Sequence, residues 1–170
     1  MPGVFVTGTD TDVGKTQVAA ALVHLLAQQG YRTAGLKPVA SGCRRTMDGL
    51  RNDDALTLMA ASNVELPYTT VNPVALEPAT APHLAAGGEI ALSPLVSACQ
   101  VAVDRVDWTV VEGAGGWMVP LGCGRTMADL AVALNYPVVL VVGLWFSEQA
   151  GVFWLVYLIS SFVLLVALSR

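Results

Sequence analysis

The chain has 170 residues, which is enough for one domain with a hydrophobic core. Its net charge is −4 and it contains no basic run, so we expect no nucleic-acid partner. The three cysteines, Cys43, Cys99 and Cys123, are too scattered for a disulfide framework or a zinc site, which favours a reducing cytoplasm. Because the apolar run Val4 to Val6 follows Met1 almost directly, we expect no signal peptide.

A glycine-flanked turn lies between that apolar run and an amphipathic pattern from Val18 to Leu26, which Gly30 is placed to end. The turn reads Gly8-Thr9-Asp10-Thr11-Asp12-Val13-Gly14-Lys15-Thr16. Strand, turn and helix in this order are typical of a phosphate-binding loop, whose backbone N–H groups form an anion nest at the positive end of the helix dipole. We therefore expect Lys15 to reach terminal phosphates and the Thr16 hydroxyl to ligate magnesium.

The turn departs from the common pattern in spacing and in charge. Five residues rather than four separate Gly8 from Gly14, and two of them, Asp10 and Asp12, are acidic. Carboxylates beside phosphates repel unless a metal ion or a cationic substrate lies between them.

A second buried strand is expected over residues 33–39, ending at Lys37 because Pro38 cannot donate to a ladder. This places Lys37 at the carboxyl edge of a parallel sheet, where ligands bind. A helix is expected over residues 53–61 with Asn52 as its cap. Asp53 and Asp54 then either serve only the helix dipole or have a role at the site.

The middle of the chain gives weaker signals. Residues 64–88 are rich in proline and threonine and are expected to form a long surface loop, in which His83 has a structural role. Ser93 and Pro94 predict the start of a helix that runs to about Val106.

A third buried strand is expected over residues 108–112, and it ends in Glu112 before the glycine-rich residues 113–116. Many nucleotide hydrolases hold the magnesium shell with an acid in this position, although a glycine turn with an incidental acid is the alternative. A short helix over 126–134, which carries Asp129, and a fourth strand over 138–144 complete the pattern. Strands alternate with helices, so the fold class is α/β with a mostly parallel sheet.

Residues 1–144 resemble the dethiobiotin synthetase family, which has a phosphate-loop NTPase-like fold. The resemblance rests on five segments and includes the extra loop residue: Gly8 to Thr16, Lys37 to Gly42, Arg51 to Asp54, Val71 to Pro73 and Val111 to Gly116. It implies a ligase of biotin biosynthesis that makes a cyclic urea from 7,8-diaminononanoate, carbon dioxide or bicarbonate, and ATP with Mg²⁺. A homodimer is implied as well. A relationship to other deviant phosphate-loop ATPases is the weaker option, and the Lys37 segment speaks against it.

The resemblance also implies roles for single residues. Lys37 and Lys15 match catalytic positions, and Thr16, Asp54 and Glu112 match the metal site. Ser41 and Thr11 match substrate contacts, and our own hypothesis adds that Asp12 faces an amino group of the diamine. The residues implied to bind ATP are Asp12, Val13, Gly14, Lys15, Thr16, Gln17, Asp54, Glu112, Gly113, Ala114 and Gly115.

The resemblance ends near Leu144, before the family's adenine-binding and dimer-forming segments. Hydrophobic residues make up 54% of the chain, and much of this excess lies in residues 145–170. We therefore divide the chain into an incomplete domain (1–144) and an apolar tail (145–170), which we expect to be helical over 152–168. Three interpretations of the tail stay open: a membrane anchor through 149–169, a frame-shifted end, and a buried core helix. An inactive remnant that at most binds nucleotide phosphates is the alternative to a working enzyme.

Overall fold

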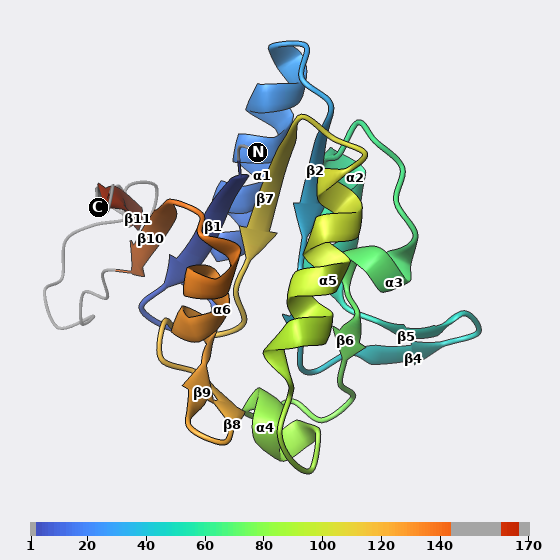
Figure 1. The fold of residues 1–170 in the computed structure, drawn as a ribbon, viewed down its shortest axis with the longest axis vertical. Coiled ribbons are helices and arrows are strands. Elements are labelled where there is room, and N and C mark those ends of the chain that lie inside the picture. Colours follow the sequence, from blue (N-terminus) through green and yellow to red (C-terminus); the bar gives the residue numbers. More distant parts are fainter. Residues whose placement is uncertain (1–2, 144–160, 167–170) are drawn as a thin grey trace, which may run out of the picture.

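The computed structural model describes residues 3–143 and 161–166, and its centre is a five-stranded sheet (Figure 1). The strand order is β11-β10-β1-β7-β2. Strands β10, β1, β7 and β2 run parallel to one another, and the edge strand β11 pairs antiparallel with β10. The bounds are β1 Gly3–Gly8, β2 Thr33–Leu36, β7 Trp108–Glu112, β10 Val138–Gly143 and β11 Ser161–Val166.

Helices cover both faces of the sheet. On one face α1 (Lys15–Gln28) and α2 (Asp53–Ala61) pack against Val6, Val110 and Val141. On the other, α5 (Leu92–Val103) and α6 (Met127–Leu134) pack against Phe5 and Val111 (Figure 1). Neighbouring residues of one strand thus serve opposite layers, as the alternation of side chains along a strand requires. The predicted α/β class with a mostly parallel sheet is confirmed.

Smaller elements lie around the carboxyl end of the sheet. These are β3 (Val39–Ala40) paired with β6 (Val74–Ala75), the hairpin of β4 (Arg44–Thr46) and β5 (Gly49–Arg51), and the hairpin of β8 (Pro120–Gly122) and β9 (Arg125–Thr126). Two one-turn helices, α3 (Tyr68–Val71) and α4 (Pro82–Ala85), complete the list.

Local signals located several ends of elements correctly. The second strand stops at Leu36, just before Lys37, and Asn52 caps α2 by accepting a hydrogen bond from the Ala55 N–H. Thr126 caps α6 in a reciprocal capping box with Asp129.

In the middle of the chain one prediction is wrong, and another is confirmed for the presence of a helix but not for its cap and bounds. Residues 64–88 are not one surface loop: they contain α3, β6 and α4, and Leu66 and Val71 are buried against the core. Helix α5 begins at Leu92 rather than at Ser93, its N-cap Ala91 provides no side-chain cap, and it ends at Val103 rather than Val106. Pro94 is tolerated because N–H groups of the first turn have no acceptor within the helix.

The expected apolar C-terminal helix is also wrong where the structure describes it. Residues 161–166 form β11, which pairs with β10 from Ser161 opposite Gly143 to Val166 opposite Val138. An apolar run without periodicity fits a strand as well as a helix, and the free edge of β10 offers a complete row of backbone partners. The rest of the tail, residues 145–160 and 167–170, lies outside the described residues. Among the helices that the structure does describe, none has the length and apolar character that a membrane span requires.

Candidate functional site

The turn between β1 and α1 forms a tight loop at the carboxyl edge of the sheet. Gly14 is the N-cap of α1 with φ 94°, and Asp12 also has a positive φ of 58°. A Cβ atom on Gly8 would lie 2.6 Å from the Val13 side chain, so only glycine fits there. Gly14 gives α1 no side-chain cap, and helix geometry leaves the first N–H groups without intrahelical acceptors. The loop therefore presents the features of an anion nest.

Lys15 lies inside this loop. Its side chain is buried, and Nζ donates a hydrogen bond of 2.6 Å to the backbone oxygen of Asp10. Burial and the neighbouring Lys37 charge lower the pKa of Lys15, although Glu112, Asp54 and Asp12 act in the opposite direction. The Lys15 ammonium therefore lies within the loop that would bind a phosphate.

Lys37 is the centre of a buried cluster of charges. Nζ donates to Glu112 Oε1 at 2.6 Å, to Asp54 Oδ2 at 2.9 Å and to the Gly113 oxygen at 3.2 Å. An ammonium has three protons, and here each has an acceptor. The residue that follows β2, one from α2 and one from β7 thus meet at one nitrogen atom, as the parallel topology predicts for carboxyl ends of neighbouring strands.

Glu112 contributes both carboxylate oxygens to the site. Oε1 also accepts a hydrogen bond of 2.9 Å from Thr16 Oγ1, whereas Oε2 is buried and has no hydrogen-bond partner among the described residues. A buried carboxylate oxygen without a partner is costly in an isolated protein and indicates that a cation belongs there.

These residues fit a magnesium ion. Oxygens of Thr16, Asp54 and Glu112 are hard ligands of the kind that Mg²⁺ prefers. No group of three or more His, Cys, Asp or Glu side chains in the described ranges is arranged to hold a metal ion. The site therefore offers two carboxylates and a hydroxyl, which suits a cation that keeps water and phosphate ligands.

The electrostatics of the cluster hold Lys37 in its charged form. Burial disfavours that charge, but the carboxylates of Glu112 and Asp54 outweigh it and raise the pKa of Lys37. Burial likewise raises the pKa of Glu112, although the ammonium counteracts this, and for Asp54 the ammonium outweighs burial and lowers the pKa. Asp54 thus serves more than the helix dipole, whereas its neighbour Asp53 pairs with Arg44 on the surface.

The glycine-rich segment after β7 packs directly on the phosphate loop. The Trp117 N–H donates to the Gly8 oxygen at 3.1 Å, and a Cβ atom on Gly116 would lie 3.1 Å from the Thr9 oxygen. Gly115 has φ 60° and lies near the Thr11 hydroxyl. Gly113, Ala114 and Gly115 thus lie within the same edge of the sheet as the loop, and close backbone approach explains the glycines.

The remaining candidate residues surround the cluster without a hydrogen bond to it. Thr11, Asp12 and Gln17 are exposed, and Ser41 has a buried Oγ with no partner among the described residues. His83 lies away from the cluster with Nδ1 3.2 Å from the Pro120 oxygen, as expected of a structural histidine.

The sequence patterns missed two polar residues that support the cluster, Tyr68 and Asn72. Asn72 is buried, donates to the Lys37 oxygen at 2.6 Å and accepts a hydrogen bond from Tyr68. The assignment of residues 64–88 to a surface loop hid them. One signal could have pointed to Asn72: it lies in the segment from Val71 to Pro73, which is one of the five that carry the resemblance.

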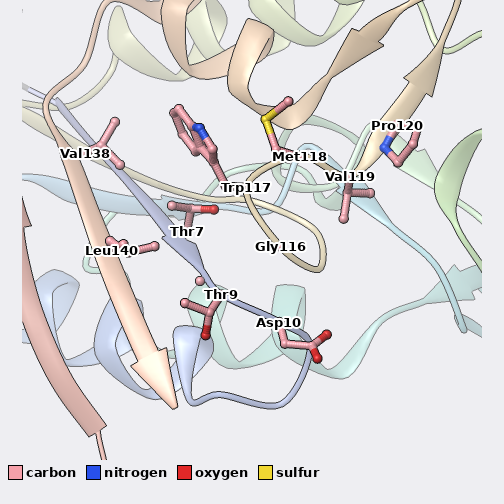
Figure 2. A pocket seen from close by; sticks show the side chains of 11 residues that line it. Thr7, Thr9, Asp10, Gly116, Trp117, Met118, Val119, Pro120, Val138 and Leu140 are labelled. Carbon is pink, nitrogen blue, oxygen red and sulfur yellow. The ribbon is translucent and has the colours of Figure 1, made fainter. Parts of the chain in front are cut away.

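A cavity of about 660 Å³ adjoins the phosphate loop on the α6 side of the sheet (Figure 2). Trp117, Val138 and Leu140 point into it, and Asp10 lies at its rim (Figure 2). Thr7 lines it with a buried hydroxyl that has no partner in the described part of the chain. The cavity borders the loop but excludes Lys37 and both carboxylates, so the charged cluster and the hollow are neighbours rather than one site.

Comparisons with known proteins show what the whole chain is similar to. Residues 2–148 match a family model described as an AAA domain. The chain is 54% identical over 147 residues to the ATP-dependent dethiobiotin synthetase of Pseudomonas paraeruginosa, 53% over 143 residues to that of Cellvibrio japonicus, and 55% over 148 residues to that of Chromohalobacter salexigens.

These alignments cover 84%, 82% and 85% of this chain but 64%, 63% and 62% of the relatives, so the chain spans less than two thirds of their length. Among solved structures, the signal recognition particle receptor FtsY from Elizabethkingia anophelis in complex with GDP matches with a TM-score of 0.38 and 16% identity, covering 82% of this chain and 39% of that chain. That likeness is too low to carry an argument.

Proposed function

Because the chain belongs to the AAA domain family and is a relative of the ATP-dependent dethiobiotin synthetases, we propose that it uses magnesium-ATP to close a cyclic urea on a diamine. The substrate is 7,8-diaminononanoate and the one-carbon unit is carbon dioxide. One amine and carbon dioxide form a carbamate, the γ-phosphoryl group of ATP is transferred to a carbamate oxygen, and the second amine attacks the carbon and releases phosphate. ADP and phosphate leave with the ring.

The observation that carries this proposal is the convergence at Lys37 Nζ. A charged, buried lysine lies between Asp54 and Glu112, and Thr16 of the phosphate loop is bonded to the same Glu112 oxygen. A cation fixed in a water-poor site stabilises developing negative charge more strongly than one in water. Lys37 is thus suited to carbamate and phosphoryl oxygens.

Each remaining residue has a role in this scheme. Lys15 and the N–H groups of residues 12–17 bind the phosphates, and Gly113, Ala114 and Gly115 allow the nucleotide to approach the backbone. Thr16, Asp54 and Glu112 hold Mg²⁺, which when bound neutralises phosphate charge. Ser41 and Thr11 contact the diamine, and Asp12 faces one of its amino groups. Residues 1–144 are the catalytic domain, and a homodimer is the expected assembly.

Phosphate binding by Lys15 is the first test. Wild type and Lys15→Ala are titrated with magnesium-ATP by calorimetry, and the variant is expected to lose binding because no other cationic side chain lies in the loop. A variant that binds as wild type does would remove the central assignment. Ring closure is then assayed with diaminononanoate, bicarbonate and magnesium-ATP.

The alternative is a chain that binds nucleotide phosphates without turnover. The observation that favours it is the length of the relatives, of which this chain spans less than two thirds. Orientation of substrates contributes on the order of 7–11 kcal/mol in well-placed reactions, so a site lacking part of its contacts would be slow. Binding without ring closure in the assay above would select this alternative.

A further inference from the structure

We propose that Asn72 and Tyr68 are positioning residues that fix Lys37 and Asp54 relative to each other. The proposal rests on the function proposed for the charged cluster. Neither residue touches the cluster's charged atoms; both act on the backbone that carries them.

Lys37 needs support from outside the sheet because β2 is an edge strand. Its N–H donates to the Val71 oxygen at 2.9 Å, and its carbonyl oxygen accepts a hydrogen bond of 2.6 Å from Asn72 Nδ2. Asn72 is only 2% exposed and its second contact, to the Val74 oxygen, measures 3.3 Å. The segment from Val71 to Val74 thus takes the place of the missing neighbour strand at the residue where the strand ends.

The same asparagine connects to the helix that carries Asp54. Tyr68 donates its hydroxyl proton to Asn72 Oδ1 at 3.0 Å, and its oxygen accepts a hydrogen bond of 2.8 Å from the Asn52 N–H. Asn52 caps α2 through its own side chain, two residues before Asp54. The Arg51 guanidinium lies 4.2 Å from the centre of the Tyr68 ring and holds the ring in place.

Each hydrogen bond in the series from Asn52 through Tyr68 and Asn72 to Lys37 can run in only one direction. Tyr68 has a single proton, and the Asn52 N–H can only donate, so that proton must go to Asn72 Oδ1. Turning the Asn72 amide would bring its oxygen against the Lys37 oxygen, where two acceptors repel. The hydrogen bonds therefore admit one arrangement, and with the Lys37–Asp54 contact they close a ring of interactions.

The ring fixes both members of the ion pair from the backbone side. Removing one link leaves Lys37 bonded to Glu112 but lets the backbone of residue 37 and the start of α2 move apart. Substitution of residues that orient ligands of a metal site typically weakens metal affinity or activity about 10–100-fold. We expect a loss of about tenfold in magnesium-dependent ATP affinity for each single link.

The test uses two variants and two matched controls in the full chain. Tyr68→Phe removes one hydroxyl, and Tyr136→Phe is its control, because Tyr136 bonds Thr109 at 3.0 Å. Asn72→Ala removes the amide at the carboxyl end of β2. Asn63→Ala is its control: Asn63 accepts from the Thr33 N–H at 2.7 Å and donates to the Tyr31 oxygen at 2.8 Å, at the opposite end of the same strand.

Two readouts separate positioning from general stability. The first is the ¹⁵N signal of the Lys37 ammonium in ligand-free protein with labelled lysine; the chain has two lysines, and Lys15→Ala assigns them. Three acceptors protect this ammonium from exchange, so wild type and both controls should show the signal, and Tyr68→Phe and Asn72→Ala should broaden or lose it. The second is magnesium-ATP affinity, which should fall about tenfold in the two variants and stay within about twofold in the controls.

Each outcome has one meaning. An unchanged ammonium signal in Tyr68→Phe and Asn72→Ala, or equal effects of variants and controls at matched unfolding free energy, overturns the positioning role. Failure of wild type to bind magnesium-ATP overturns the proposed function instead, and the ammonium signal still decides the positioning role. If Asn72→Ala does not fold, the Tyr68 pair carries the comparison alone.

Discussion

Replacing Lys37 by methionine should destabilise the protein and make its stability depend on magnesium. The substitution keeps most of the side-chain volume but removes the ammonium from between Glu112, which is 0% exposed, and Asp54. Breaking a buried ion pair by removing one partner costs about 3–5 kcal/mol, because the other charge stays buried. We expect a loss of this size in the unfolding free energy at pH 7 without metal.

Magnesium should restore much of that loss if the two carboxylates form a metal site. A ligand present at 100 times its dissociation constant stabilises the native state by about 2.7 kcal/mol. Lowering the pH should also help the variant, since burial raises the pKa of Glu112 and the ammonium no longer opposes it. A folded-state pKa above the unfolded value means that stability is gained as the pH falls toward the unfolded value.

The assay is urea unfolding of wild type and Lys37→Met, with EDTA or with magnesium, at pH 7 and pH 5. Arg32→Met is the control, because the Arg32–Asp107 pair is exposed at 63% and 41% of the two side chains and such pairs contribute only about 0.2–1 kcal/mol. If Lys37→Met loses no more than Arg32→Met, the cluster does not hold charge as described. If magnesium stabilises neither Lys37→Met nor wild type, the carboxylates are not its ligands.

Three further predictions follow from other parts of the structure. Asp12→Asn should weaken affinity for the diamine severalfold, as one attraction to an amino group is lost, and calorimetry that finds unchanged affinity would exclude this contact. The pKa of Asp54 is lowered in the folded protein, so Asp54 stabilises the fold above its unfolded pKa of 3.8, and this stabilisation should be lost as the pH falls through the folded pKa. An acid titration in which Asp54→Asn and wild type lose the same unfolding free energy would contradict this. A thiol reagent should label Cys123 first, because Cys43 and Cys99 are buried and burial raises the pKa of Cys99 to about 12. Glu89→Gln should speed the labelling of Cys123, since contact with Glu89 raises the pKa of that thiol. Mass spectrometry of the labelled peptides decides both points.

The parts of the site that sequence predicted depend on local patterns. The glycine spacing of the phosphate loop, Asn52 as a cap and an acid at the end of an apolar strand are each defined by residues close together in the chain. Parallel topology then brings their ends to one edge of the sheet. This is why Thr16, Lys37 and Glu112 could be placed together before any contact was known.

The parts that sequence missed depend on long-range packing. Tyr68 and Asn72 lie in a segment rich in proline and threonine, and they are ordered because β2 is an edge strand with open backbone groups. Nothing within residues 64–88 states that this edge is nearby. The helix prediction for the apolar tail was wrong for a similar reason. The composition of the tail fits helix and strand equally, and pairing with the edge of β10 favours the strand for residues 161–166.

Lysine and arginine occupy different places in this protein. The chain has two lysines, Lys15 and Lys37, and both are buried at the site, at 5% and 4% exposure. The arginines that form ion pairs in the described part of the chain lie on the surface; these are Arg32, Arg44, Arg45 and Arg125. Lysine is a compact point charge that can turn between partners, whereas the planar arginine fork favours fixed bidentate pairs. Lys37 is bonded to the two carboxylates that are also the proposed metal ligands. It can leave them for a substrate oxyanion without leaving buried negative charge only when another cation neutralises them. The charges of the site therefore favour one order: a cation held by Asp54 and Glu112, as magnesium would be in the proposed function, would neutralise them first, and Lys37 would then be available to a substrate oxyanion.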